Sequence, residues 1–276
     1  MSRPIRALID LSALEHNLSV VRRHAPRSRI MVVIKADAYG HGLLRAAEAF
    51  KSADGFAILE LEAAIRLREA GYEHHILLIE GFFSRSELEL FERYHLSTVI
   101  HNSEQLEMLS AYKRPRGLDV FLKLNTGMNR LGFTPEQFPG ALELLKDNPV
   151  VGQITLMTHF ACADSYKDRN GVAEQLKCFN SITSNLNFPC SLANSAAILS
   201  YPETHADWVR PGIMLYGSSP FPDISASELD LRSAMTLTSK VIAVQYLHTG
   251  DTVGYGQTYR VNRSMRVGIV AGGYAD

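Results

Sequence analysis

The stretch Met31-Val-Val-Ile-Lys-Ala-Asp-Ala-Tyr-Gly-His-Gly42 is the most informative part of the sequence about the fold. Four apolar residues run directly into Lys35, and a glycine-rich turn follows. A short apolar run bounded by turn residues is typical of a buried parallel strand, so we expect Lys35 at the end of a core strand. Burial lowers the pKa of a lysine, and the neutral amine condenses with a carbonyl to form a Schiff base. The alternative is a lysine that reaches solvent at the strand end and pairs with Asp37.

Strands and helices alternate along the chain on both sides of this stretch. An isolated strand is expected over residues 3–10, and a helix follows that Ser12 would cap together with Glu15. After the Lys35 strand, further strands are expected at residues 56–59, 75–79, 96–101, 120–124, 153–159, 191–193 and 208–215, each followed by a helix or a long turn. Such an alternation with about eight strands predicts a closed (β/α)₈ barrel of the TIM type.

The pattern changes after about residue 225. Threonine-, valine- and glycine-rich runs without helical periodicity predict a mainly antiparallel β domain. We therefore expect an N-terminal strand at residues 1–10 that pairs with the β domain, a barrel over residues 11–226, and a partial β domain over residues 227–276. A β domain of some fifty residues is thin by itself, so the sequence is expected to lack its C-terminal part.

Composition narrows the possible partners and compartment. The chain has 276 residues, 46% of them hydrophobic, and a net charge of −1 without any basic block. This argues against nucleic acid or a membrane surface as a partner. The three cysteines form no Cys-x-x-Cys pair, which predicts a reducing compartment and gives no reason to expect a metal site. The N-terminus has no signal-peptide pattern, so a cytoplasmic location is expected.

Polar residues recur where the predicted strands end, which is where barrels carry their chemistry. They are Lys35, Glu60, Glu80, Asn102, Lys123, His159, Ser195 and Arg210. Lys35 can bind an aldehyde, the helix that begins near Asn194 offers free N–H groups to a phosphate, and Arg210 can only donate hydrogen bonds. An aldehyde, a phosphate and an aromatic nitrogen together describe pyridoxal 5′-phosphate.

Six motifs resemble those of alanine racemase in order and cover nearly the whole chain. They are Val33-Ile-Lys-Ala-Asp-Ala-Tyr-Gly-His-Gly, Lys123-Leu-Asn-Thr-Gly-Met-Asn-Arg-Leu-Gly, Thr158-His159, Asn194-Ser-Ala-Ala, Val209-Arg-Pro-Gly-Ile-Met-Leu-Tyr-Gly and Gly254-Tyr-Gly. The resemblance implies a barrel with a β domain, acting as a homodimer with pyridoxal phosphate on L- and D-alanine. It implies an isomerase that supplies D-alanine for peptidoglycan or catabolises it.

The resemblance also assigns the proton-transfer groups and the phosphate contacts. Lys35 resembles the Schiff-base lysine, which is one of two bases, and Tyr255 resembles the second base, contributed by the partner subunit. Two bases are needed because one group cannot readily serve both faces of a planar carbanion. The implied phosphate contacts are Tyr39, Ser195, Gly212 and Ile213.

Four further roles follow from the same resemblance. Arg210 is similar to the arginine that faces the pyridine nitrogen, and His159 to the histidine that hydrogen-bonds this arginine. Because an arginine does not give up its proton, the ring nitrogen is expected to stay unprotonated, which limits side reactions. Arg130 resembles the arginine at the cofactor phenolate and the substrate carboxylate. Lys123 matches a lysine that the family often carries as a carbamate.

Three other functions compete with racemisation. A non-catalytic pyridoxal-phosphate barrel would use the same lysine, but it lacks a β domain, and Gly254-Tyr255-Gly256 argues against it. A barrel decarboxylase would remove the substrate carboxylate, and a Schiff-base aldolase would need no cofactor. A protein that ends at residue 276 is expected to have an incomplete substrate entrance and little or no activity.

Overall fold

The computed structural model describes residues 3–112, 117–165 and 169–273, and the chain divides into two compact units. The larger unit spans residues 10–234, and the smaller combines residues 1–9 with residues 235–276. The end of the predicted β domain, residues 274–276, lies outside the described part of the chain. The domain boundaries expected at residues 10 and 226 stay a prediction.

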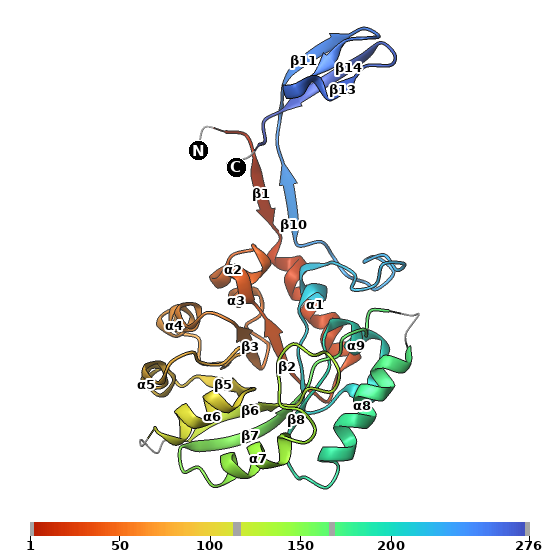
Figure 1. The fold of residues 1–276 in the computed structure, drawn as a ribbon. Helices are drawn as coiled ribbons and strands as arrows, with labels where there is room; N and C mark the ends of the chain where they lie inside the picture. Colours follow the sequence, from red (N-terminus) through yellow and green to blue (C-terminus); the bar gives the residue numbers. More distant parts are fainter. Residues whose placement is uncertain (1–2, 113–116, 166–168, 274–276) are drawn as a thin grey trace. The chain divides into compact units, whose positions relative to one another are not determined.

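Eight parallel strands close into a barrel in the larger unit, which confirms the predicted fold class (Figure 1). Pairing of β2 with β9 closes the barrel. The strands are β2 (Arg29–Val33), β3 (Gly55–Ile58), β4 (His75–Leu78), β5 (Ser97–Ile100), β6 (Leu118–Lys123), β7 (Val151–Met157), β8 (Cys190–Ser191) and β9 (Trp208–Val209).

Alternate side chains of these strands fill the barrel interior, because successive residues of a strand face opposite sides of the sheet. The resulting cluster draws on seven of the strands and contains Met31, Val33, Ala57, Leu77, Val99, Phe121, Met157 and Trp208. A filled interior leaves the strand ends as the place where a ligand can bind.

Helices follow the strands around the barrel (Figure 1). They are α1 (Leu11–His24), α2 (Lys35–Tyr39), α3 (Leu43–Ala49), α4 (Leu61–Glu69), η1 (Arg85–Glu87), α5 (Leu88–Arg93), α6 (Ser103–Ser110), α7 (Phe138–Lys146), α8 (Arg169–Thr183), α9 (Ser195–Ser200), η3 (Pro202–Thr204) and η4 (Ile213–Tyr216). Within the described residues, none of the helices combines the length and apolar character needed to cross a bilayer.

The N-cap of α1 differs from the prediction. Asp10, not Ser12, caps the helix: its carboxylate accepts a hydrogen bond from the Ala13 N–H at 3.1 Å. The Ser12 hydroxyl donates to the same carboxylate at 2.6 Å. The predicted capping box was wrong because the helix begins at Leu11, which places Ser12 inside its first turn.

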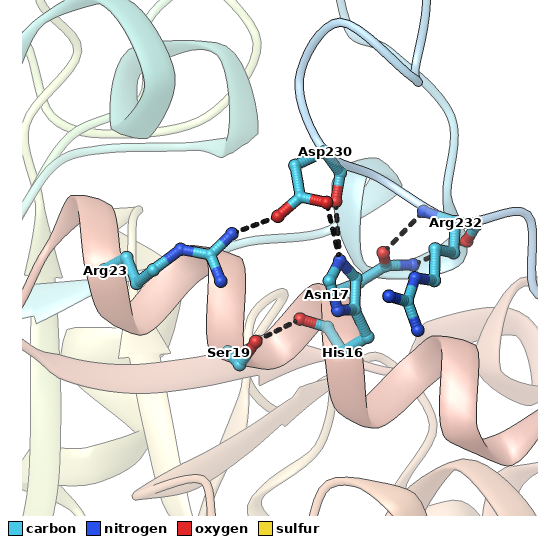
Figure 2. A network of polar contacts seen from close by, with 6 residues as sticks. All are labelled: His16, Asn17, Ser19, Arg23, Asp230 and Arg232. Atoms are coloured by element: carbon cyan, nitrogen blue, oxygen red, sulfur yellow. Dashed lines mark hydrogen bonds and ion pairs between the residues drawn. The ribbon is translucent and has the colours of Figure 1, made fainter.

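A polar network ties α1 to the chain that leaves the barrel (Figure 2). The Asn17 side chain donates to the carbonyls of Leu215 and Arg232 at 2.9 and 2.8 Å, and it accepts from the Arg232 N–H at 2.8 Å. The carboxylate of Asp230 contacts both His16 and Arg23. Asn17 is fully buried, so this paired amide fixes the returning chain against the first helix.

The smaller unit is made of antiparallel strand pairs. Strand β1 (Arg6–Ile9) pairs with β10 (Met235–Thr238), β11 (Val241–Leu247) with β14 (Met265–Val270), and β12 (Thr252–Val253) with β13 (Tyr259–Arg260). The short 3₁₀ helix η5 (Tyr255–Gln257) connects β12 to β13.

Candidate active site

The carboxyl ends of the barrel strands carry most of the predicted site residues. Lys35 follows β2, Lys123 is the last residue of β6, His159 follows β7, Ser195 begins α9 after β8, and Arg210 follows β9. Four cations, namely Arg210, Lys123, Arg130 and Lys35, lie near enough to His159 to lower its pKa. The barrel therefore gathers these side chains at one end.

The element α2 (Lys35–Tyr39) is a left-handed turn rather than an ordinary right-handed helix, and the residues of this turn are not glycines. Ala36, Asp37, Ala38 and Tyr39 have φ values of 51°, 51°, 56° and 55°. Each such residue costs about 1–2 kcal/mol relative to a right-handed one. Strain of this kind persists where surrounding contacts impose it, and it clusters at functional sites. Here it turns the chain sharply between Lys35 and Tyr39.

The carboxylate of Asp37 is used inside this turn. Its Oδ1 accepts a hydrogen bond from the Leu43 N–H at 2.8 Å, at the start of α3. In the described part of the chain, no ion pair joins Asp37 to Lys35. The alternative explanation of Lys35 as a simple surface ion-pair partner therefore finds no support in the geometry.

Tyr39, Gly212 and Ser195 lie together at one side of this strand-end site. A side chain at Gly212 would place its Cβ 2.8 Å from the Tyr39 hydroxyl, so glycine is required for the approach. The Ser195 hydroxyl accepts from the N–H groups of Gly212 and Met214 at 2.9 and 3.4 Å. Ile213 lies between these two amides, and its side chain is 42% exposed.

Arg210 is buried and held by four hydrogen bonds. Its guanidinium donates to the Ser191 hydroxyl at 2.6 Å, to the carbonyls of Thr158 and Leu192 at 2.7 and 3.1 Å, and to His159 Nδ1 at 3.3 Å. Burial lowers the pKa of Arg210 to about 10, which still leaves the group cationic at neutral pH.

The His159 imidazole is neutral in this environment. Burial, with Arg210 and Lys123 as the largest nearby charges, lowers the pKa of His159 to about 3. Arginine cannot accept a hydrogen bond, so Nδ1 of His159 is the acceptor and its proton resides on Nε2. The histidine thus presents a fixed donor next to the Arg210 guanidinium.

Lys123 is buried beside two arginines. Burial is the main cause that lowers the pKa of Lys123 to about 8; Arg210 and Arg130 lower it further, and Glu80 raises it. Arg130 itself is exposed, in the loop after β6. A substantial fraction of the Lys123 amine is therefore neutral just above physiological pH.

Tyr255 belongs to the smaller unit and is 96% exposed. It begins η5, between Gly254 and Gly256, which have φ values of 76° and 70°. These left-handed glycines form a tight turn that presents the phenol ring to solvent.

Several residues around the site were not found by the sequence argument. Asn102 was expected among the strand-end groups, but its side chain caps α6 by accepting from the Gln105 N–H. His101, one position earlier, instead contacts the Glu80 carbonyl at 3.0 Å; burial lowers its pKa, and the nearby charge of Lys123 lowers it further. A one-residue error in the strand end is enough to exchange the two side chains.

Two polar side chains, those of Gln175 and Thr126, bind the segment that contains Thr158 and His159. Gln175 of α8 donates to the His159 carbonyl at 3.1 Å and to the Thr126 hydroxyl at 3.0 Å. Thr158 and Thr126 are joined through their hydroxyls at 2.8 Å. No local sequence signal identifies these residues, because their partners lie 16 to 49 positions away along the chain.

The opposite end of the barrel has a cavity of about 240 Å³. Its lining includes His75, Ser97 and Leu118, which begin β4, β5 and β6. None of the predicted site residues lines it.

Comparison with known proteins agrees with this geometry over the whole chain. Residues 9–220 match the model of the alanine racemase N-terminal domain, and residues 234–276 match that of the C-terminal domain. The alanine racemase of Nitrosospira multiformis is 66% identical over 276 residues, which are all of this chain and 77% of that protein. The Nitrosomonas eutropha alanine racemase is 58% identical with the same coverage.

A solved structure gives the same result in three dimensions. The biosynthetic alanine racemase from Pseudomonas aeruginosa superimposes with a TM-score of 0.96 at 43% identity, covering 99% of this chain and 76% of that one. The match to a C-terminal domain does not favour a carrier barrel, and the relatives' names do not favour a decarboxylase. The chain therefore belongs to the alanine racemase family, whose members are pyridoxal-phosphate-dependent isomerases.

Proposed function

We propose that this chain interconverts L- and D-alanine by proton transfer on opposite faces of the substrate, with Lys35 and Tyr255 as the two bases. The observation that carries the proposal is the position of Lys35: it follows the first barrel strand, at the start of a strained turn, and its charge acts on the buried His159. Two groups are required because a base on one side of a planar carbanion cannot deliver a proton to the other side.

The residues at the strand ends fit pyridoxal phosphate. Gly212 leaves room that a Cβ would fill next to the Tyr39 hydroxyl, and Ser195 orders the neighbouring amides. We assign Tyr39, Ser195, Gly212 and Ile213 to the phosphate. When bound, the cofactor supplies an aldehyde that Lys35 can hold covalently and a conjugated ring that takes up the charge left by the α-proton.

Arg210, supported by His159, would face the pyridine nitrogen of the cofactor and disfavour its protonation. The Arg210 guanidinium is cationic, donates only, and is fixed by Ser191 and two backbone carbonyls. A cation in this position disfavours a second positive charge on the ring. His159, neutral and accepting through Nδ1, binds the same guanidinium nitrogen that donates to the two carbonyls.

Lys123 and Arg130 form the substrate-carboxylate side of the site. Arg130 is the group we assign to the carboxylate, since guanidinium forms paired hydrogen bonds to it. Carbamylation is proposed for Lys123, because only a neutral amine reacts with carbon dioxide and the pKa of Lys123 is lowered to about 8. The resulting anion would lie between cations rather than add to them.

Tyr255 is proposed to act in the site of a partner subunit, in a homodimer. Its 96% exposure in the single chain supports this, because a phenol between two glycines has no local packing role. We further propose a cytoplasmic enzyme that supplies D-alanine for peptidoglycan; a relative, the Pseudomonas aeruginosa protein, is described as biosynthetic.

The test follows the α-hydrogen of L-alanine in deuterated water, by chiral chromatography for racemisation and by NMR for exchange. We expect Lys35→Ala and Tyr255→Phe to abolish racemisation, with a loss of at least about 100-fold for removal of a proton-transfer group. Tyr246→Phe is the matched control, because Tyr246 is also an exposed tyrosine of the smaller unit.

Two results would contradict the assignment: racemisation that persists in Tyr255→Phe, or borohydride fixation of the cofactor to a side chain other than Lys35. The same measurements are made on a chain with the length of its relatives, of which this chain covers 77%; racemisation by the Tyr255→Phe variant of that chain would likewise contradict the assignment.

A further inference from the structure

We propose that His41 and Tyr216 are positioning residues that hold Tyr39 against the cofactor's phosphate by fixing the left-handed turn. The inference rests on the proposed contact between Tyr39 and the phosphate. Neither residue belongs to the site as assigned above. Both contact the turn between Lys35 and Tyr39.

The His41 ring fixes the turn through its Nδ1–H group. This group donates to the carbonyls of Ala38 and Tyr39, at 3.0 and 3.1 Å. The two acceptors belong to left-handed residues, whose backbone would relax without an imposed contact. Because carbonyls only accept, the proton must reside on Nδ1. The ring is 7% exposed, and within the described residues its Nε2 has no hydrogen-bond partner, so its polar contribution comes from Nδ1.

Tyr216 connects the same turn to the barrel. Its ring packs on both Tyr39 and His41, with centroid distances of 4.6 and 4.7 Å. Its hydroxyl donates to the carbonyl of Val33 at 2.9 Å, in the last residue of β2. Tyr216 lies at the end of η4, which begins at Ile213 directly after Gly212. The Tyr39 ring is thus located relative to both the strand that leads to Lys35 and the segment assigned to the phosphate.

This arrangement predicts that the loss of His41 or Tyr216 weakens the binding of the cofactor's phosphate more than the binding of its aldehyde. If the turn loosens, the Tyr39 hydroxyl moves away from Gly212, whereas Lys35 keeps its place at the strand end. A ligand with the aldehyde but without the phosphate, pyridoxal, should then bind almost as before. A residue that merely stabilises the fold would affect both ligands equally.

The experiment measures dissociation constants of pyridoxal phosphate and pyridoxal for the cofactor-free protein, from the visible absorbance of the bound ligand. His41→Phe keeps a ring but loses the donor, and we expect pyridoxal phosphate to bind about tenfold more weakly, the cost of roughly one buried hydrogen bond. Pyridoxal should change less than about twofold by the same scale. His41→Asn, which returns an N–H near the Nδ1 position, should recover most of the loss, and Tyr216→Leu should show the same selectivity for the phosphate.

His74→Phe is the matched control. The His74 ring also packs on an aromatic ring at 4.6 Å, that of Phe56, and its Nε2 contacts a carbonyl, that of Lys51, at 3.0 Å. This variant should leave both dissociation constants unchanged. An equal loss for both ligands in His41→Phe, or unchanged binding of pyridoxal phosphate, would overturn the inference.

Tyr39→Phe separates this inference from the proposed function. If Tyr39→Phe binds pyridoxal phosphate like the wild type, the phosphate contact itself is wrong. If Tyr39→Phe weakens binding and His41→Phe does not, the contact is right and the positioning role is wrong.

Discussion

Arg210 shows how a single buried cation can be kept in place by the fold. Its partners are the Ser191 hydroxyl, two backbone carbonyls and a neutral histidine, so within the described residues the guanidinium is hydrogen-bonded by neutral acceptors. A cation held by neutral acceptors keeps its full charge available to a ligand, whereas a carboxylate partner would offset it. This suits the role proposed for Arg210, which is to face the pyridine nitrogen.

Removal of the guanidinium should therefore cost stability as well as activity. Arg210→Ala leaves the Ser191 hydroxyl and two buried carbonyls without their donor, and we expect the free energy of unfolding to fall by about 3 kcal/mol. Urea unfolding of the cofactor-free protein measures it. Lys146→Ala, which breaks an exposed pair with Glu143, should cost less than about 0.5 kcal/mol. Equal losses of unfolding free energy in the two variants would show that the buried hydrogen bonds of Arg210 stabilise the protein no more than the exposed pair of Lys146 and Glu143.

Lys123 should make stability depend on pH in the alkaline range. Its pKa is about 8 in the folded chain and 10.5 in the reference state, so between these values the unfolded chain binds more protons. The free energy of unfolding then rises with pH, and the penalty of about 3 kcal/mol present below pH 8 is relieved toward pH 10.5. Lys123→Met should lack this rise.

Urea unfolding of both proteins in bicarbonate-free buffer measures the difference without carbamylation. Parallel stability curves of the wild type and Lys123→Met between pH 8 and pH 10.5 would show that the amine is not buried among cations as described.

At the scale of the element, the left-handed turn after Lys35 is the least ordinary feature. The strain of its alanines is offset by contacts from Gly40, His41 and Gly42 to carbonyls of the turn. Glycine adopts this conformation without the Cβ clash, although it has more freedom to lose on folding. The two effects oppose each other, and the clash is the larger.

We therefore expect Ala36→Gly to stabilise the protein by about 0.5–1 kcal/mol, which is unusual for an alanine-to-glycine change. Ala36 is exposed, so no packing is lost. Ala63→Gly, inside the right-handed helix α4, should destabilise by about 1 kcal/mol. Thermal and urea unfolding measure both; a loss of stability in Ala36→Gly would mean that the turn is not strained.

For the whole molecule, the proposed homodimer predicts a recovery of racemase activity that a monomer could not show. If Tyr255 acts in the partner's site, a heterodimer of Lys35→Ala and Tyr255→Phe subunits has one site with both bases and one with neither. Random reassociation of equal amounts should then recover about a quarter of wild-type activity, because half of the dimers are mixed and each has one working site.

The two inactive variants are prepared in a chain whose unsubstituted form racemises alanine. They are mixed, dissociated, reassociated and assayed for racemisation. Each variant reassociated alone is the control. Absence of any recovery, with mixed dimers confirmed by mass, would place both bases in one subunit.

The strand and helix pattern of the sequence predicts the closed barrel, which the structure confirms, and it places four of the candidate site residues at the strand ends. Alternation of apolar strands with helices admits few other folds, and a parallel barrel brings its strand ends to one face, so Lys35, Lys123, His159 and Arg210 could be placed from the strand pattern alone. The choice of pyridoxal phosphate followed from the chemistry of these residue types together with the family motifs.

The neighbours of these residues could be found only in the folded chain. Four acceptors bind Arg210, Gln175 donates to the His159 carbonyl, and the Tyr216 ring packs on Tyr39. These contacts join positions that are distant in the sequence. The presence of His101 rather than Asn102 at the strand end depends on a register of one residue. A left-handed turn of four non-glycine residues contradicts local preference, and it exists because contacts from outside the turn outweigh the strain. A local sequence pattern reflects interactions between residues that are close in the chain. The pKa of a side chain and the strain of a turn depend instead on the residues that the fold brings into contact with them.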